Sequence, residues 1–107
     1  MMNVYSSYES GKLNLFLQGE LDQHGIRGSV ESIESLLDEY LPRECVLDLS
    51  SLSFMDSSGI ALMLKLLRRM QREGGSFWVE NAAAQPLRVL EASGIERLMH
   101  LTLTKEG

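Results

Sequence analysis

The sequence has little of what marks a secreted or membrane-spanning protein. Its one cysteine, Cys45, cannot form an internal disulfide, so nothing in the chain requires an oxidising compartment. The longest unbroken apolar run, residues 60–64, is far shorter than the roughly 20 residues that cross a bilayer. No basic stretch followed by an apolar run opens the chain, so no secretory signal is readable. We therefore expect a cytoplasmic protein.

Positive charge is also scarce. The chain has 10 Lys and Arg against 15 Asp and Glu, which gives a formal net charge of -5 and a pI near 4.9. A nucleic-acid-binding protein needs a concentrated basic surface to neutralise phosphates, and an anionic membrane attracts the same kind of surface. We expect neither nucleic acid nor membrane among the partners.

The residues that hold metals or nucleotides are isolated or missing. His24, Cys45 and His100 stand alone, without metal-ligand spacings such as C-x-x-C or H-x-x-x-H. Neither G-x-x-x-x-G-K-[ST] nor G-x-G-x-x-G, the two common phosphate-binding motifs of nucleotide sites, occurs. The sequence therefore predicts no metal and no cofactor.

What is present is the composition of an ordinary globular protein. Hydrophobic residues make up 44% and charged residues 23% of the 107 positions. A chain of this length can bury about two-thirds of its unfolded surface around one core. We expect a single domain spanning residues 1–107.

The first half of the chain predicts a hairpin and then a helix. Apolar and polar residues alternate over residues 12–19, which is typical of a strand with one buried face, and residues 3–9 are a weaker strand. Ser10 and Gly11 suit the turn between them. Apolar residues at spacings of three and four predict a helix over 25–41, ended by Pro42, with an apolar stripe of Ile26, Val30, Ile33, Leu37 and Tyr40 or Leu41.

The second half alternates strands and helices. Strands are expected at 45–49, 76–80 and 99–104, and helices at 57–72 and from about Pro86 to Ser93, with Gly94 as a cap and a helical turn near 95–98. In the helix 57–72 we expect an inner stripe of Ile60, Met63, Leu64 and Leu67, with an apolar face widened by Ala61 and Leu62. We expect an outer, solvated stripe of Lys65, Arg68, Arg69 and Arg72.

These elements define the predicted fold class. The order is β-β-α-β-α-β-α-β, in which helices between strands imply right-handed crossovers and the opening hairpin makes the sheet mixed. We predict a small α/β domain with a mixed sheet of four to five strands and helices mainly on one face.

The most informative stretch is LSFMDSSGIALML, residues 52–64. Asp and Ser side chains cap helix N-termini by accepting hydrogen bonds from first-turn amides, at about 1 kcal/mol each. One cap needs one such residue, but Asp56, Ser57 and Ser58 occur in succession. We expect the acid and the first hydroxyl to cap the helix, which leaves Ser58 at the positive helix end, where a phosphate is electrostatically favoured.

A catalytic serine is the enzyme alternative at this position. A serine at a strand-to-helix turn is typical of the nucleophile elbow G-x-S-x-G, but the surround here is M-D-S-S-G. Only His24 and His100 could act as general bases, and one of them would have to lie within hydrogen-bond reach of Ser58. We expect no catalytic residue and no enzyme.

The chain resembles the STAS-domain anti-sigma factor antagonists, small bacterial regulators of sporulation and stress-response sigma factors. The segment VLDLSSLSFMDSSGIALML, residues 46–64, resembles their phosphorylation site, and GELDQH, residues 19–24, resembles the segment before their first helix. REGG at 72–75 and EASGIERL at 91–98 are weaker matches. The resemblance covers essentially the whole chain and implies a single STAS domain, residues 1–107.

The resemblance implies a binding module switched by phosphate. The unphosphorylated form would bind an anti-sigma factor that is also a serine kinase and so release the sigma factor. The kinase would phosphorylate Ser58, and a PP2C-type phosphatase would restore the active form. The implied partner-binding residues lie in two segments, a loop with Glu20, Leu21, Asp22, Gln23 and His24, and the site with Asp56, Ser57, Ser58 and Gly59.

The chain departs from the family pattern after GELD. Gly25 and Ile26 stand where the family leads us to expect Thr-Ala or similar, and Gly28 follows. Glycine loosens a helix start by roughly 0.5–1 kcal/mol per site relative to alanine. We therefore expect a more mobile loop or a different partner. A stand-alone STAS module that binds a small anion or a nucleotide is the alternative function.

Overall fold

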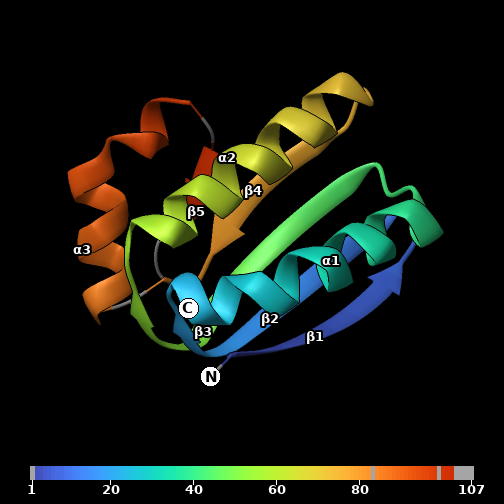
Figure 1. The fold of residues 1–107 in the computed structure, drawn as a ribbon. Coiled ribbons are helices and arrows are strands. Elements are labelled where there is room, and N and C mark those ends of the chain that lie inside the picture. Colours follow the sequence, from blue (N-terminus) through green and yellow to red (C-terminus); the bar gives the residue numbers. More distant parts are fainter. Residues whose placement is uncertain (1, 83, 99, 103–107) are drawn as a thin grey trace.

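The computed structural model describes residues 2–82, 84–98 and 100–102 and has the element order expected from the sequence (Figure 1). The elements are β1 (Met2–Glu9), β2 (Lys12–Leu21), α1 (Gln23–Tyr40), β3 (Glu44–Met55), α2 (Ser57–Arg72), β4 (Ser76–Glu80), α3 (Ala84–Ser93), the 3-10 turn η1 (Ile95–Arg97) and β5 (His100–Thr102). Of the expected last strand, positions 99, 103 and 104 lie outside the described residues.

The strands form one mixed sheet in the order β1-β2-β3-β4-β5. β1 and β2 are antiparallel and are joined at Ser10 and Gly11, which both have positive φ. The pairs β2–β3, β3–β4 and β4–β5 are parallel, so α1, α2 and α3 each lie on a crossover. The predicted fold class is confirmed.

The helices α1 and α2 cover one face of the sheet (Figure 1). Leu13, Leu15 and Leu17 of β2 are fully buried beneath them, whereas Phe16 between them is 38% exposed on the opposite face. The helix α3 packs beside α2, against the end of β3. The core therefore lies between the sheet and its helices, and the opposite face of β1 and β2 is open.

The helix α1 differs from its prediction in start and rotation. It begins at Gln23, two residues before the expected start at Gly25, because Asp22 caps it. Its buried residues are Gly25, Ser29, Ile33 and Leu37, whereas Ile26 and Val30 are only partly buried. The small residues Gly25 and Ser29 let the helix lie close to the sheet. The helix face that is buried is therefore rotated relative to the apolar stripe predicted from the sequence.

The strand β3 is longer than its prediction. It runs from Glu44 to Met55 rather than ending at residue 49. Its second half pairs with the end of β2, and Leu52 and Met55 are buried there. The sequence does not predict this second half as a strand, because residues 50, 51 and 53 are polar and only every third residue is buried, so the alternation of apolar and polar residues is missing.

The helix α2 has the predicted bounds but a wider buried arc. Leu62, Met63 and Leu67 are buried as expected, whereas Ala61 is exposed and Ile60 and Leu64 are only partly buried. The buried set also includes Leu66 and Met70. The reason is that α2 has α1 on one side and α3 on the other, as well as the sheet below.

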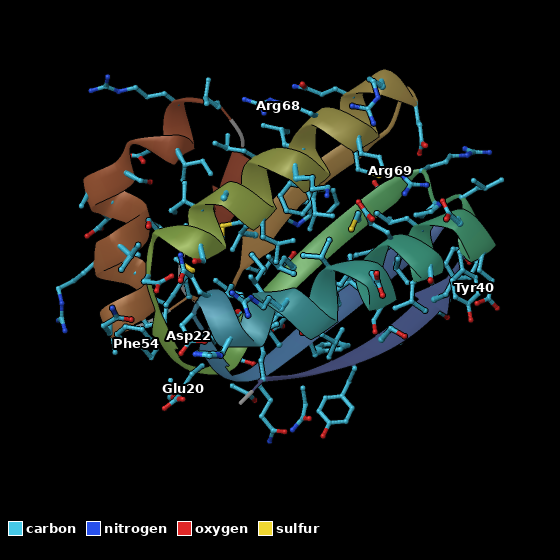
Figure 2. The ribbon with its side chains drawn as sticks, viewed as in Figure 1. Glu20, Asp22, Tyr40, Phe54, Arg68 and Arg69 are labelled. Atoms are coloured by element: carbon cyan, nitrogen blue, oxygen red, sulfur yellow. The ribbon has the colours of Figure 1, made fainter. Side chains whose placement is uncertain are left out.

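Arg69 was expected on the solvated stripe, and this was wrong. Its side chain is only 16% exposed and lies between α2 and α1 (Figure 2). It contacts Asp38 at 2.6 Å and Glu73 at 3.2 Å, and the hydrogen bond to Asp38 raises the pKa of the guanidinium. Lys65 pairs with Glu34 at 3.2 Å. Part of the basic stripe therefore joins α2 to the acidic residues of α1.

Candidate functional site

The two segments singled out in the sequence lie side by side at the carboxyl ends of β2 and β3. These strands are parallel neighbours, and their last residues, Leu21 and Met55, are paired. The backbone N–H of Asp56 donates to the carbonyl of Leu21 at 3.2 Å, which joins the two strand ends directly. Figure 2 shows Glu20, Asp22 and Phe54 at this same end of the sheet. The helices α1 and α2 both begin here.

An aspartate caps each of these helices. The Asp22 carboxylate accepts a hydrogen bond from the backbone N–H of Gly25, and the Asp56 carboxylate accepts one from the backbone N–H of Ser58, each at 2.8 Å. The bond from Gly25 lowers the pKa of Asp22, because it favours the charged carboxylate. Both helix starts are thus fixed by side-chain caps, each of a kind worth about 1 kcal/mol in proteins.

The hydroxyls of the two serines take no part in capping, although the backbone N–H of Ser58 donates to the Asp56 cap. We expected the hydroxyl of Ser57 to share the cap with Asp56, but Asp56 caps alone and Ser57 is exposed. Within the described residues, neither Ser57 nor Ser58 has a hydrogen-bond partner for its hydroxyl. Ser58 is half-exposed and lies at the positive end of a helix of 16 residues. Within the described residues, a group attached to its hydroxyl would replace no hydrogen bond of the fold.

The segment Glu20–His24 is not the loop that we expected. Glu20 and Leu21 end β2, Asp22 is the cap, and Gln23 and His24 are the exposed first residues of α1. The side chain of Leu21 is fully buried, so it supports the site from below and does not present a contact to a partner. The physical reason is the cap at Asp22, which starts the helix directly after the strand.

Gly25 and Gly59 are close-packing positions. A Cβ at Gly59 would overlap the Met55 side chain and lie 2.9 Å from Leu21 Cδ2. A Cβ at Gly25 would overlap the carbonyl oxygen of Glu20 and lie 3.1 Å from the Met2 Cβ. The expectation of a loosened helix start is therefore wrong for Gly25, which lets α1 pack directly on the strand ends. Gly28, by contrast, faces open space.

Gln85 is a site residue that sequence reasoning missed. Its side-chain amide pairs with the backbone of Met55 as a neighbouring strand would, because its Oε1 accepts from the Met55 N–H and its Nε2 donates to the Met55 carbonyl, both at 2.8 Å. This holds the end of β3 one residue before Asp56. The preceding residue, Ala84, has a φ of 55°, so the entry into α3 is strained. No sequence pattern marks a glutamine for this role.

A groove and an aromatic residue flank the serines. The groove has a volume of about 380 Å³, lies between α2 and α3, and is lined by Ser57, Ile60, Gln85, Arg88, Val89, Ala92 and Ser93. Phe54, two residues before Asp56, is 40% exposed. An exposed aromatic ring and an apolar groove beside exposed hydroxyls form a surface suited to binding a protein.

The catalytic and metal alternatives find no support in the described residues. Among the described side chains, no histidine forms a hydrogen bond with Ser57 or Ser58, and the His100 side chain is outside that set. No group of three His, Cys, Asp or Glu in the described parts of the chain could hold a metal ion. Cys45 is a buried core residue whose pKa burial raises to about 12. None of the helices described is long and apolar enough to cross a membrane.

Comparison with known proteins places the chain in a family. The model of the STAS domain matches residues 7–107. The anti-sigma F factor antagonist of Paenibacillus polymyxa is 30% identical over 102 residues, which cover 92% of this chain and 84% of that protein.

Solved structures agree on the fold. The structure of an anti-sigma factor antagonist from Mycobacterium paratuberculosis has a TM-score of 0.85 at 20% identity and covers 95% of this chain and 86% of that one. The anti-sigma factor antagonist SpoIIAA in its unphosphorylated form has a TM-score of 0.79 at 24% identity and covers 94% and 88%. These structures show the fold, and the family model together with the sequence relative leads to one conclusion: the chain belongs to the STAS domain family.

Proposed function

We propose that this STAS domain is an anti-sigma factor antagonist, a regulator that binds an anti-sigma factor when unphosphorylated and is switched off by phosphate on Ser58. The observation that carries the proposal is the hydroxyl of the half-exposed Ser58 at the start of α2, which has no hydrogen-bond partner among the described residues and lies beside an aspartate that already fills the capping role. The names of the similar proteins support the antagonist function, and one of them is described in an unphosphorylated form.

The phosphate would act on binding rather than on folding. A phosphoserine carries about -1.5 to -2 charges. At the start of α2 it gains about 0.3–1 kcal/mol from the helix dipole, and the nearby carboxylate of Asp56 opposes this by a similar or larger amount. Because these effects nearly cancel, we expect the fold to survive phosphorylation.

Across a closed interface the balance changes. A partner carboxylate about 6 Å away, at an effective dielectric near 20, repels each added charge by about 3 kcal/mol. Burial of the doubly charged group without a partner costs more. Since 1.4 kcal/mol corresponds to a tenfold change in affinity, the expected loss is a hundredfold or more.

The partner would cover both segments of the site. We propose that Glu20, Asp22, Gln23 and His24 form one half of the surface and Asp56, Ser57 and Ser58 the other, with Leu21 and Gly59 buried beneath them. Phe54 and the groove beside Ser57 extend it. The partner is an anti-sigma factor with serine-kinase activity, and a PP2C-type phosphatase reverses the modification. The chain itself is then not an enzyme and acts in the cytoplasm.

The test is transfer of one phosphate to one serine. The chain is incubated with ATP and the anti-sigma factor serine kinases of its own genome, and its intact mass is measured for wild type, Ser58→Ala and Ser57→Ala. Wild type and Ser57→Ala should each gain one phosphate, whereas Ser58→Ala should gain none.

Two results contradict the proposal. Loss of the phosphate in Ser57→Ala but not in Ser58→Ala would move the switch to the other serine. Absence of phosphate with every kinase, together with tight binding of a nucleotide or a small anion in calorimetry, would favour the stand-alone ligand-binding module.

A further inference from the structure

The strand β1 forms an edge of the sheet that carries few protective features. Within the described residues it hydrogen-bonds only to β2, so its other side presents unpaired N–H and C=O groups. Protein sheets usually protect such edges with lysines, prolines, bulges or short strands. β1 is eight residues long and pairs with β2 without a bulge, and its sequence MNVYSSYE contains no lysine or proline and one charge, Glu9 at its end.

A groove runs along this edge, between β1 and α1. Its volume is about 610 Å³, and Met2, Asn3 and Val4 line it from the strand. From the helix side it is lined by His24, Gly25, Gly28, Ser29, Ser32 and Leu36. None of the residues that line the groove is a carboxylate, and Glu34 and Asp38 of α1 face α2. Two copies that meet at the groove itself therefore bring no like charges of its lining into contact.

We propose that two copies of the chain associate through β1, in an antiparallel pair of edge strands that joins the two sheets into one. An antiparallel pair of identical strands is self-complementary about a two-fold axis, which is the commonest symmetry of protein dimers. Each strand supplies the hydrogen-bond partners that the other lacks. The inference concerns a surface other than the one in the proposed function and does not depend on it.

The helix layer fits this arrangement. α1 packs on both β1 and β2, and adjacent strands lie about 4.8 Å apart, so the axis of α1 lies roughly 5 Å from the two-fold axis. The two copies of α1 would then be about 10 Å apart, within the usual range for packed helices. Gly28 and Ser32 lie on this side of α1 and are small enough for such an approach.

The expected interface is small, so the dimer should be weak. Eight paired residues give a contact about 27 Å long, and with the helix layer roughly 400–500 Å² per copy would be buried. Interfaces of this size belong to the weak, transient class. We therefore expect a dissociation constant of roughly 10 to several hundred micromolar.

The experiment is sedimentation equilibrium of the full chain from about 10 µM to 1 mM, a range chosen to bracket that constant. Ser6→Lys places a charge on each copy near the middle of the paired strands and should weaken the dimer at least tenfold. Ser76→Lys makes the same change at an exposed serine of β4, three strands away, and should leave the constant unchanged. Circular dichroism checks that both variants fold.

Two outcomes overturn the proposal. One is a wild-type chain that stays monomeric at 1 mM. If such a monomer binds an extended peptide at the β1 edge, the partner of this edge is a different protein and the proposal is equally wrong. The other is a dimer that Ser6→Lys and Ser76→Lys weaken equally. As a second measurement, the amide signals of β1 residues should shift with protein concentration in NMR spectra of the wild type, and those of α2 should not.

Discussion

The starts of α1 and α2 are built alike but differ in the two residues that follow each capping aspartate. Each begins with the pattern Asp-x-x-Gly, DQHG at 22–25 and DSSG at 56–59. In each, the aspartate caps the helix and the glycine packs where a Cβ would overlap its neighbours. Between them α1 has Gln23 and His24, and α2 has two serines. The fold needs the aspartates and the glycines at both starts, so the hydroxyls of α2 are free for another use.

The largest effect is expected when a charge is placed on Ser58, one of the two serines that distinguish the start of α2 from that of α1. Ser58→Asp should fold like wild type but bind the anti-sigma factor at least a hundredfold more weakly, because a carboxylate is buried against the partner. Ser76→Asp, the same change at an exposed serine of β4, should bind normally. Calorimetric titration measures both constants. If a well-folded Ser58→Asp protein bound with wild-type affinity, charge at the start of α2 would not control binding, and the two helix starts would not differ in function.

Substitutions at the glycines test whether the two starts are equally constrained. Gly59→Ala and Gly25→Ala should each lower the free energy of unfolding by about 1–3 kcal/mol, because the added methyl overlaps packed atoms. Gly28→Ala is the control on the same helix as Gly25. It should raise that free energy by roughly 0.5–1 kcal/mol, since its Cβ meets open space. Urea unfolding measures all three, and a neutral Gly59→Ala would contradict the close packing.

A smaller loss of stability than at the packed glycines should come from removing Gln85, a support at the start of α2 that has no counterpart among the described residues at the start of α1. Gln85→Ala removes both hydrogen bonds to the Met55 backbone and should cost about 1–2 kcal/mol, with water replacing part of the loss. Hydrogen exchange should quicken at the Met55 amide and leave the Gly25 amide unchanged. Equal acceleration at both amides would show that Gln85 stabilises the domain as a whole and not the start of α2.

The predictions from the sequence succeeded where one local pattern decides the structure. The turn at Ser10 and Gly11, the bounds of α2 and β4, and the cap at Gly94 each depend on turn chemistry, periodicity or a left-handed glycine. The predictions failed where contact with another strand or helix, distant in the sequence, determines the structure. The second half of β3 is a strand because β2 pairs with it, and Arg69 is partly buried because Asp38 of α1 faces it.

The candidate site divides in the same way. The sequence by itself determined the fold class, the helix start at Asp56 and the spare hydroxyl of Ser58, because caps and periodicities are local properties of the chain. That Ser57 also leaves the cap to Asp56 was decided by the structure. Only the tertiary structure decided that Asp22 and Asp56 lie at adjacent strand ends, that Gly25 is a packing position and that Gln85 holds Met55. These contacts join residues far apart in the chain, and their geometry exists only once the parallel strands β2 and β3 have paired.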